Sequence, residues 1–94
     1  MNWLEIIELQ TVDSHRHQSG SDLNKVLEGI QDTENKHLLK IYTRYAVESD
    51  LSIHISHSSN EIYHSGSPFG IQLASTLKKF GLVHHSVWIE TAGK

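Results

Sequence analysis

In residues 51–58, LSIHISHS, apolar and polar side chains alternate from Leu51 to Ser56. Such alternation predicts a β-strand with one face against a core and the other toward solvent or a partner. The residues divide between the faces as follows: Leu51, Ile53 and Ile55 on the core face, and Ser52, His54, Ser56 and Ser58 on the polar face.

A second strand is predicted over residues 38–47, joined to the first by the turn-like residues 48–50, Glu-Ser-Asp. Pairing Val47 with Leu51 keeps apolar residues on the core face, and it sets Arg44 opposite His54. The same register sets Tyr42 opposite Ser56. We therefore expect a hairpin with a three-residue connection.

The remaining elements are predicted from both ends of the chain. Residues 2–12, NWLEIIELQTV, form a strand with apolar residues on both faces, which is typical of a central strand. Apolar residues at helical spacing predict a helix over about 21–34. Ser67-Pro68 starts a second helix, which Gly81 ends, and residues 84–91 form the last strand.

The order strand-helix-strand-strand-helix-strand predicts the α+β class and a single domain over residues 1–94. Right-handed crossovers give the ferredoxin-like βαββαβ sandwich, with four antiparallel strands and both helices on one face. The usual strand order for this topology is 4-1-3-2, which places the first strand in the centre of the sheet.

Composition narrows the classes of function. Eight Lys and Arg against eleven Asp and Glu give a formal charge of −3, which argues against nucleic acid or a membrane surface as a partner. No apolar run approaches the ~20 residues of a membrane span. The chain has no Cys, which removes disulfides and thiolate sites and is compatible with a cytoplasmic location.

The two helices can cover only one face of the sheet, so the other face needs a different explanation. That face is predicted to carry polar and aromatic residues together: Tyr42, Arg44, Ser52, His54, Ser56, Ser86 and Trp88, with one row of the first strand. An exposed Trp and an apolar row make a poor solvated surface. We expect a two-fold homodimer in which two such faces enclose a partly polar cavity.

The chain also resembles a known superfamily. The residues that carry the resemblance are Asp50 to Ile55, then Gly66-Ser67 and Gly70, then Phe80 to Val83 and His85 to Glu90. In these and in its order of elements the sequence is similar to an uncharacterised group of small proteins in the dimeric α/β-barrel superfamily, which includes the antibiotic biosynthesis monooxygenases. The resemblance implies a homodimer with a cavity. It does not carry over a reaction, because the full catalytic sets of the known enzymes are not recognisable.

The polar face supplies the candidate site. We expect His54 to act as a base or hydrogen-bond partner, with Arg44 anchoring an anionic oxygen and Tyr42 donating a proton or a hydrogen bond. A small planar or anionic ligand would be framed by the remaining residues of that face: Trp88, Ser52, Ser56 and Ser86. Trp3 is a further candidate for stacking, although interface packing is the commoner role of an indole.

Three functions follow from this site, and they stay open. The first is proton-transfer chemistry of the cofactor-free monooxygenase or isomerase kind. The second is a non-catalytic dimeric module in which Arg44 pairs with a carboxylate such as Glu5, Glu8 or Glu90. The third is a metal site.

The eight His residues prompt the idea of a metal site. However, strand alternation separates His54 from His57 and His84 from His85, so scattered histidines are the more economical interpretation. Two alternatives stay open: a site formed by His54 with His57, and a loop cluster of His15, His17 and His64. We predict no metal and no cofactor.

Overall fold

The structure is a computed structural model of the chain, and it describes residues 1–11, 25–29 and 38–91. The strands are β1 (Asn2–Thr11), β2 (Leu38–Arg44), β3 (Val47–Ser58) and β4 (Gly81–Ile89). Helix α3 (Pro68–Leu77) runs into a 3₁₀ turn, η1 (Lys78–Phe80). A further helical segment covers residues 25–29, inside the predicted 21–34 helix, whose other residues lie outside the described part.

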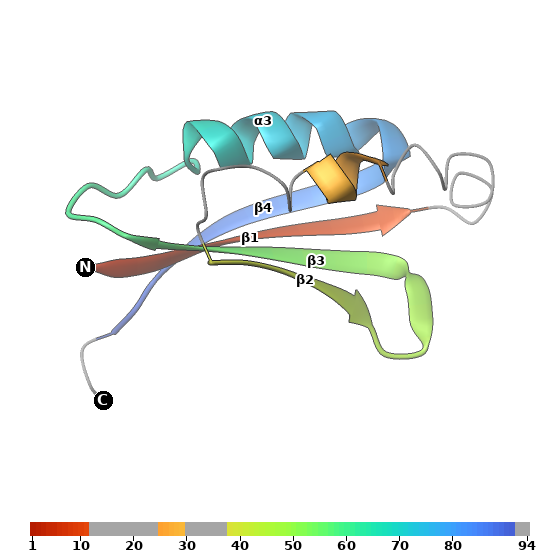
Figure 1. The fold of residues 1–94 in the computed structure, drawn as a ribbon, viewed down its shortest axis with the longest axis horizontal. Coiled ribbons are helices and arrows are strands. Elements are labelled where there is room, and N and C mark those ends of the chain that lie inside the picture. The colour runs from red at the N-terminus through yellow and green to blue at the C-terminus, as the bar shows by residue number, and fades with distance from the viewer. Residues whose placement is uncertain (12–24, 30–37, 92–94) are drawn as a thin grey trace.

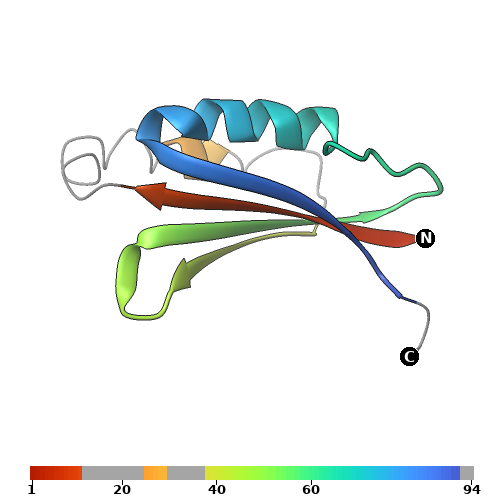
Figure 2. The ribbon, with the colours of Figure 1, turned by 180° about the vertical axis from the view of Figure 1, so that it is seen from behind.

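The four strands form one antiparallel sheet in the order β2-β3-β1-β4. The predicted α+β class and four-stranded antiparallel sheet are therefore confirmed, and the arrangement is compatible with a ferredoxin-like fold. Strands β1 and β3 are the inner strands, in keeping with the two-sided apolar pattern of β1. Helix α3 and the segment 25–29 lie on the same side of the sheet (Figures 1 and 2).

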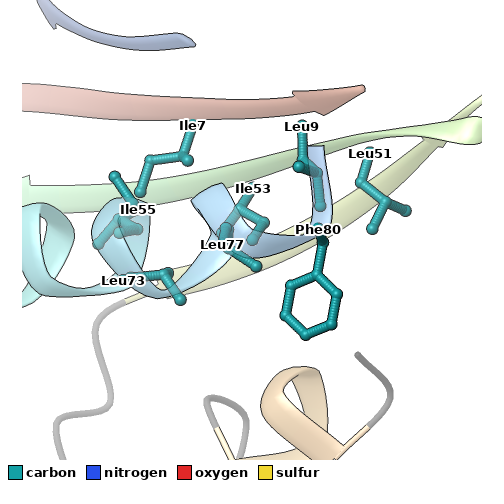
Figure 3. Packing of buried hydrophobic residues seen from close by; sticks show 9 residues of the cluster. Ile7, Leu9, Leu51, Ile53, Ile55, Leu73, Leu77 and Phe80 are labelled. Atoms are coloured by element: carbon teal, nitrogen blue, oxygen red, sulfur yellow. The ribbon is translucent and has the colours of Figure 1, made fainter. Parts of the chain in front are cut away.

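The core lies between the sheet and α3. Ile7 and Leu9 on β1 pack beside three β3 residues and against one side of the helix (Figure 3). The buried apolar cluster is Ile7, Leu9, Leu51, Ile53, Ile55, Leu73, Ala74, Leu77 and Phe80. The predicted core face of β3 is thus confirmed, because all three of its apolar residues are buried.

The start of α3 is also as predicted. Ser67 is the N-cap, and its hydroxyl oxygen accepts a hydrogen bond from the Gly70 backbone N–H at 3.0 Å. Pro68 occupies the first helical position, where its missing N–H costs no hydrogen bond. Gly81 follows the helical stretch at the predicted position, as the C-cap of η1, but its backbone is extended (φ 162°) and it opens β4. A glycine is needed there because a Cβ would collide with the Gln10 carbonyl oxygen.

The predicted register of the hairpin is wrong by four residues. The chain turns at Tyr45-Ala46, where Ala46 takes a positive φ of 64°, and residues 48–50 belong to β3. As a result His54 lies opposite Lys40, not opposite Arg44, and Tyr42 lies opposite Ser52. A register shift by an even number of residues leaves each side chain on the same face of the sheet, so the prediction of which residues face the core is unaffected.

No helix in the described residues is long and apolar enough to cross a membrane.

Candidate functional site

The side of the sheet away from α3, called the open face below, has no helix over it in the described part of the chain (Figure 1). The hairpin between β2 and β3 bends toward this side (Figures 1 and 2). Side chains of the open face lie in successive rows that run across the strands, and the strand register defines each row. These rows determine which polar groups meet.

One row crosses all four strands. Tyr42 on β2 is opposite Ser52 on β3, and Ser52 is opposite Glu8 on β1. Glu8 is in turn opposite His84 on β4. Directly paired residues on one face of an antiparallel sheet have their Cβ atoms about 4.5–5.5 Å apart. A phenol, a hydroxyl, a carboxylate and an imidazole therefore form one line, which we call the transverse row.

The transverse row lines a cavity of about 510 Å³ near the hairpin end of the sheet. The other lining residues come from the same four strands, next to the transverse row: Leu9, Gln10, Thr43, Arg44, Asp50, Leu51, Leu82 and Val83. Small-molecule sites in proteins have volumes of about 300–1,000 Å³ and combine apolar walls with a few polar groups. This cavity fits that description.

Some charged side chains of the cavity have an ion-pair partner among the described residues and one does not. Arg44 forms an ion pair with Asp50, with the guanidinium Nη1 3.2 Å from Oδ2. Glu8 has no hydrogen-bond or ion-pair partner among the residues that the structure describes. The alternative in which Arg44 pairs with Glu5, Glu8 or Glu90 is therefore replaced by pairing with Asp50, and Glu8 is the unpaired charge of the site.

His54, predicted as the base, lies beside the cavity and is not part of its lining. Its Nε2 is 3.0 Å from the Ser52 hydroxyl oxygen, and its ring is 4.8 Å from that of Tyr42, centroid to centroid. The predicted pairing of His54 with Arg44 is wrong because of the register. The structure does bring His54, Tyr42 and Ser52 together.

The other predicted ligand contacts lie farther along the open face. The Trp88 indole N–H donates to the Ser86 hydroxyl oxygen at 2.8 Å, and the Trp88 side chain is exposed. Ser56 lies opposite Leu4, which is opposite Trp88. None of the three predicted residues lines the cavity.

A second polar cluster lies on the other side of the sheet, under the start of α3. Glu5 of β1 is fully buried among the core residues. Its Oε1 accepts hydrogen bonds from the Ser67 backbone N–H (3.1 Å) and from His85 (2.8 Å). Its Oε2 accepts from the Ser67 hydroxyl (2.5 Å) and from His57 (2.6 Å). An ionised carboxylate only accepts, so both imidazoles donate through Nε2.

Two glycines allow this cluster to close. A Cβ on Gly70 would collide with the Glu5 carboxylate, and a Cβ on Gly66 would collide with the His85 ring. The Trp3 indole stacks on His57 with ring centroids 4.0 Å apart, which holds that imidazole in place. The cluster ties three strands to one helix terminus.

Electrostatics favour the ionised form of Glu5. Burial acts to raise the pKa of its carboxyl group. Hydrogen bonds from the Ser67 hydroxyl, from the two imidazoles and from the Ser67 N–H act in the opposite direction and prevail, so the pKa lies below its usual value. The N-terminus of α3, which carries a partial positive charge, points at the same carboxylate. We assign the cluster a structural role, since the Glu5 carboxylate is fully buried and its hydrogen bonds all come from the protein.

Among the described residues, no group of three His, Asp or Glu side chains is arranged to hold a metal ion. His54 and His57 lie on opposite faces, as predicted, since His57 contacts Glu5 on the core side. His15 and His17 of the proposed loop cluster lie outside the described residues.

Sequence reasoning missed Glu8, His84 and Glu5 as site or cluster residues. Glu8 and His84 could have been found from parity, because both share the face of His54 once β1 is placed between β3 and β4. Glu5 gave a clear signal as well. It stands between Trp3 and Ile7 on the apolar face of a central strand, where an unpaired charge would be costly.

Comparisons with known proteins show the fold alone. No protein-family model and no curated protein matches the chain. Among solved structures, Rv0793 from Mycobacterium tuberculosis is similar, with a TM-score of 0.59 over 99% of this chain and all of that one. The two sequences are 15% identical.

Proposed function

We propose that the chain forms a homodimer of the dimeric α/β-barrel kind through its open faces, and that each protomer binds a small molecule in the cavity beside the transverse row. The observation that carries the proposal is the cavity itself. It places four polar groups of different chemistry along one line on the uncovered side of the sheet.

Apolar surface on the open face supports the dimer. Trp88 is 57% exposed and Leu82 is 74% exposed, while Leu4 and Ile6 are half-buried. Apolar surface of this kind gains about 25 cal/mol for each Å² removed from water. A second open face is the partner that symmetry offers, since an isologous interface buries the same patch on both copies.

The geometry favours binding over the catalytic arrangement expected from the sequence. That arrangement needs Arg44 and His54 together, whereas Arg44 is engaged by Asp50 and His54 by Ser52. Glu8 and His84 are among the residues that line the cavity, and neither was part of the expected catalytic arrangement.

Sedimentation velocity at micromolar concentration tests the dimer. The wild-type chain should sediment at twice the mass of one chain, and Trp88→Glu should sediment as a monomer because the substitution places charge in the interface. Ile71→Glu is the matched control, since Ile71 is 48% exposed on α3, away from the open face. A monomeric wild type, or equal behaviour of the two variants, would contradict the dimer.

Amide NMR spectra test the cavity. Small aromatic compounds at millimolar concentration should shift amides of the transverse row and leave those of α3 in place. Shifts scattered over both sides of the sheet would mean that no specific cavity is occupied.

A further inference from the structure

The unpaired charge in the cavity identifies the chemistry of its ligand, and this inference rests on the binding function proposed above. We propose that the cavity binds a small organic cation, a protonated amine attached to an apolar or aromatic group. The ammonium is held by the Glu8 carboxylate between Ser52 and His84, and the apolar portion lies against Tyr42 and Leu82.

The first argument is charge. Within the part of the chain that the structure describes, the cavity lining contains two carboxylates, Glu8 and Asp50, and one guanidinium, Arg44. Arg44 and Asp50 neutralise each other at 3.2 Å. Counting the Asp, Glu, Lys and Arg side chains that the structure describes, the lining has a net charge of −1, and that charge is on Glu8. An opposite charge is the complement that such a site lacks.

The second argument is hydrogen bonding. An ammonium group has three donors and no acceptor. Around Glu8 the transverse row provides a carboxylate, the Ser52 hydroxyl and the His84 imidazole, each of which can accept a hydrogen bond. Ser52 keeps an acceptor lone pair even when its hydroxyl contacts His54. The three acceptors come from three adjacent strands, with Ser52 and His84 on either side of Glu8.

The third argument is the aromatic wall. Tyr42 stands at the β2 end of the row and is half exposed toward the cavity. A tyrosine ring face attracts cations within about 6 Å of its centroid. Leu82 adds apolar surface in the neighbouring row. The ammonium of the ligand therefore meets the polar groups of the transverse row, and its hydrocarbon portion meets Tyr42 and Leu82.

An anionic ligand, the class expected from the sequence, fits less well. Arg44 is the one guanidinium of the lining among the described residues and is already paired, with 67% of its side chain exposed to water. An anion in the cavity would also approach the Glu8 carboxylate, which repels it. The cavity therefore favours a cationic ligand over the anionic ligand expected from the sequence.

Three probes with nearly the same skeleton test the inference: 2-phenylethylamine, 3-phenylpropionate and 2-phenylethanol, titrated at neutral pH and low salt with amide NMR detection. We expect the amine to bind at least about tenfold more tightly than the acid, with the alcohol between them, because a charge-assisted hydrogen bond is worth about a factor of ten or more. Glu8→Gln should weaken amine binding about tenfold and leave alcohol binding unchanged.

Glu61→Gln is the matched control, because Glu61 is an exposed carboxylate outside the cavity lining. Acid binding equal to or tighter than amine binding would overturn the inference and leave the cavity in place. Unchanged amine binding in Glu8→Gln would do the same. If none of the probes shifts open-face amides at millimolar concentration, both the inference and the proposed cavity are wrong. The comparison of probes on the wild type needs no variant to fold.

Discussion

Replacing Glu5 with Gln should strongly destabilise the fold, although the substitution changes a single atom. The Glu5 carboxylate is fully buried and accepts four hydrogen bonds from three residues. Gln keeps the shape of the side chain, but it offers one acceptor oxygen and an NH₂ group that can only donate. That NH₂ must face an imidazole N–H or a hydroxyl that donates at present.

The expected loss follows from the number and type of these contacts. Hydrogen bonds to a charged group contribute about 1.5–3 kcal/mol each, and a buried donor left without a partner costs about 1–3 kcal/mol. Relief of carboxylate desolvation offsets part of this loss. We expect a decrease of about 3 kcal/mol in the free energy of unfolding. For a domain of this size that lowers the melting temperature by about 12–24 °C.

Thermal and urea unfolding, followed by far-UV circular dichroism, measure this change. Glu8→Gln is the matched control, with the same substitution three residues along the same strand but on an exposed side chain without a described partner. It should change stability by no more than about 0.5 kcal/mol. Equal melting temperatures for the two variants would refute the assignment of Glu5 as the tie between the sheet and α3.

The same prediction has a pH dependence. The pKa of Glu5 is lower in the folded chain than its usual value, so the ionised form stabilises the fold. This contribution is complete above the unfolded pKa of about 4.3 and is lost as pH falls through the folded pKa. The stability difference between wild type and Glu5→Gln should therefore narrow below about pH 4. A difference that stays constant into acid would mean that the Glu5 charge is not what stabilises the cluster.

Further predictions concern the glycines, the hairpin and its ion pair. Gly70→Ala should destabilise the chain by several kcal/mol because its Cβ meets the buried carboxylate, whereas Gly29→Ala, with open space around it, should stabilise by about 0.5–1 kcal/mol; chemical denaturation distinguishes them. Ala46→Gly should raise stability by about 1 kcal/mol in the same assay, since it relieves a positive φ, and a loss would argue against that turn. A double-mutant cycle on Arg44 and Asp50 should give a coupling below about 1 kcal/mol, because the guanidinium is largely exposed; a larger value would show a buried pair.

The overall architecture could be predicted because it depends on patterns that survive local errors. Alternation in residues 51–58 and apolar residues on both sides of β1 identify the two inner strands. The Ser67-Pro68 pair marks a helix start that the structure confirms. None of these inferences needs a partner residue to be known, since each follows from its own stretch of chain.

The hairpin register could not be predicted from the turn residues. Residues 48–50 look like a turn, yet they continue β3, and the chain turns instead at Tyr45-Ala46, which carries no Gly, Asn or Asp. The two faces of each strand were still assigned correctly, because a register shift of four residues keeps every side chain on the same face of the sheet. The site depends on register as well as on face, so Arg44 and His54 were brought together wrongly.

Glu5 shows a different limit. A carboxylate on the apolar face of a central strand is expensive unless several donors converge on it, and those donors come from β3, β4 and α3. Its partners are 52 to 80 residues away in sequence. Only the packing of the helix on the sheet brings them together.

The central claim is that the open face is covered by a second copy of the chain. Labelling with 5-fluorotryptophan gives two fluorine resonances, one from Trp3, which is 3% exposed, and one from Trp88, which is 57% exposed in a single protomer. We predict that the Trp88 resonance loses its H₂O/D₂O solvent shift as protein concentration rises into the micromolar range, while Trp3 stays shielded throughout. A Trp88 resonance that keeps its full solvent shift at every concentration would contradict the account.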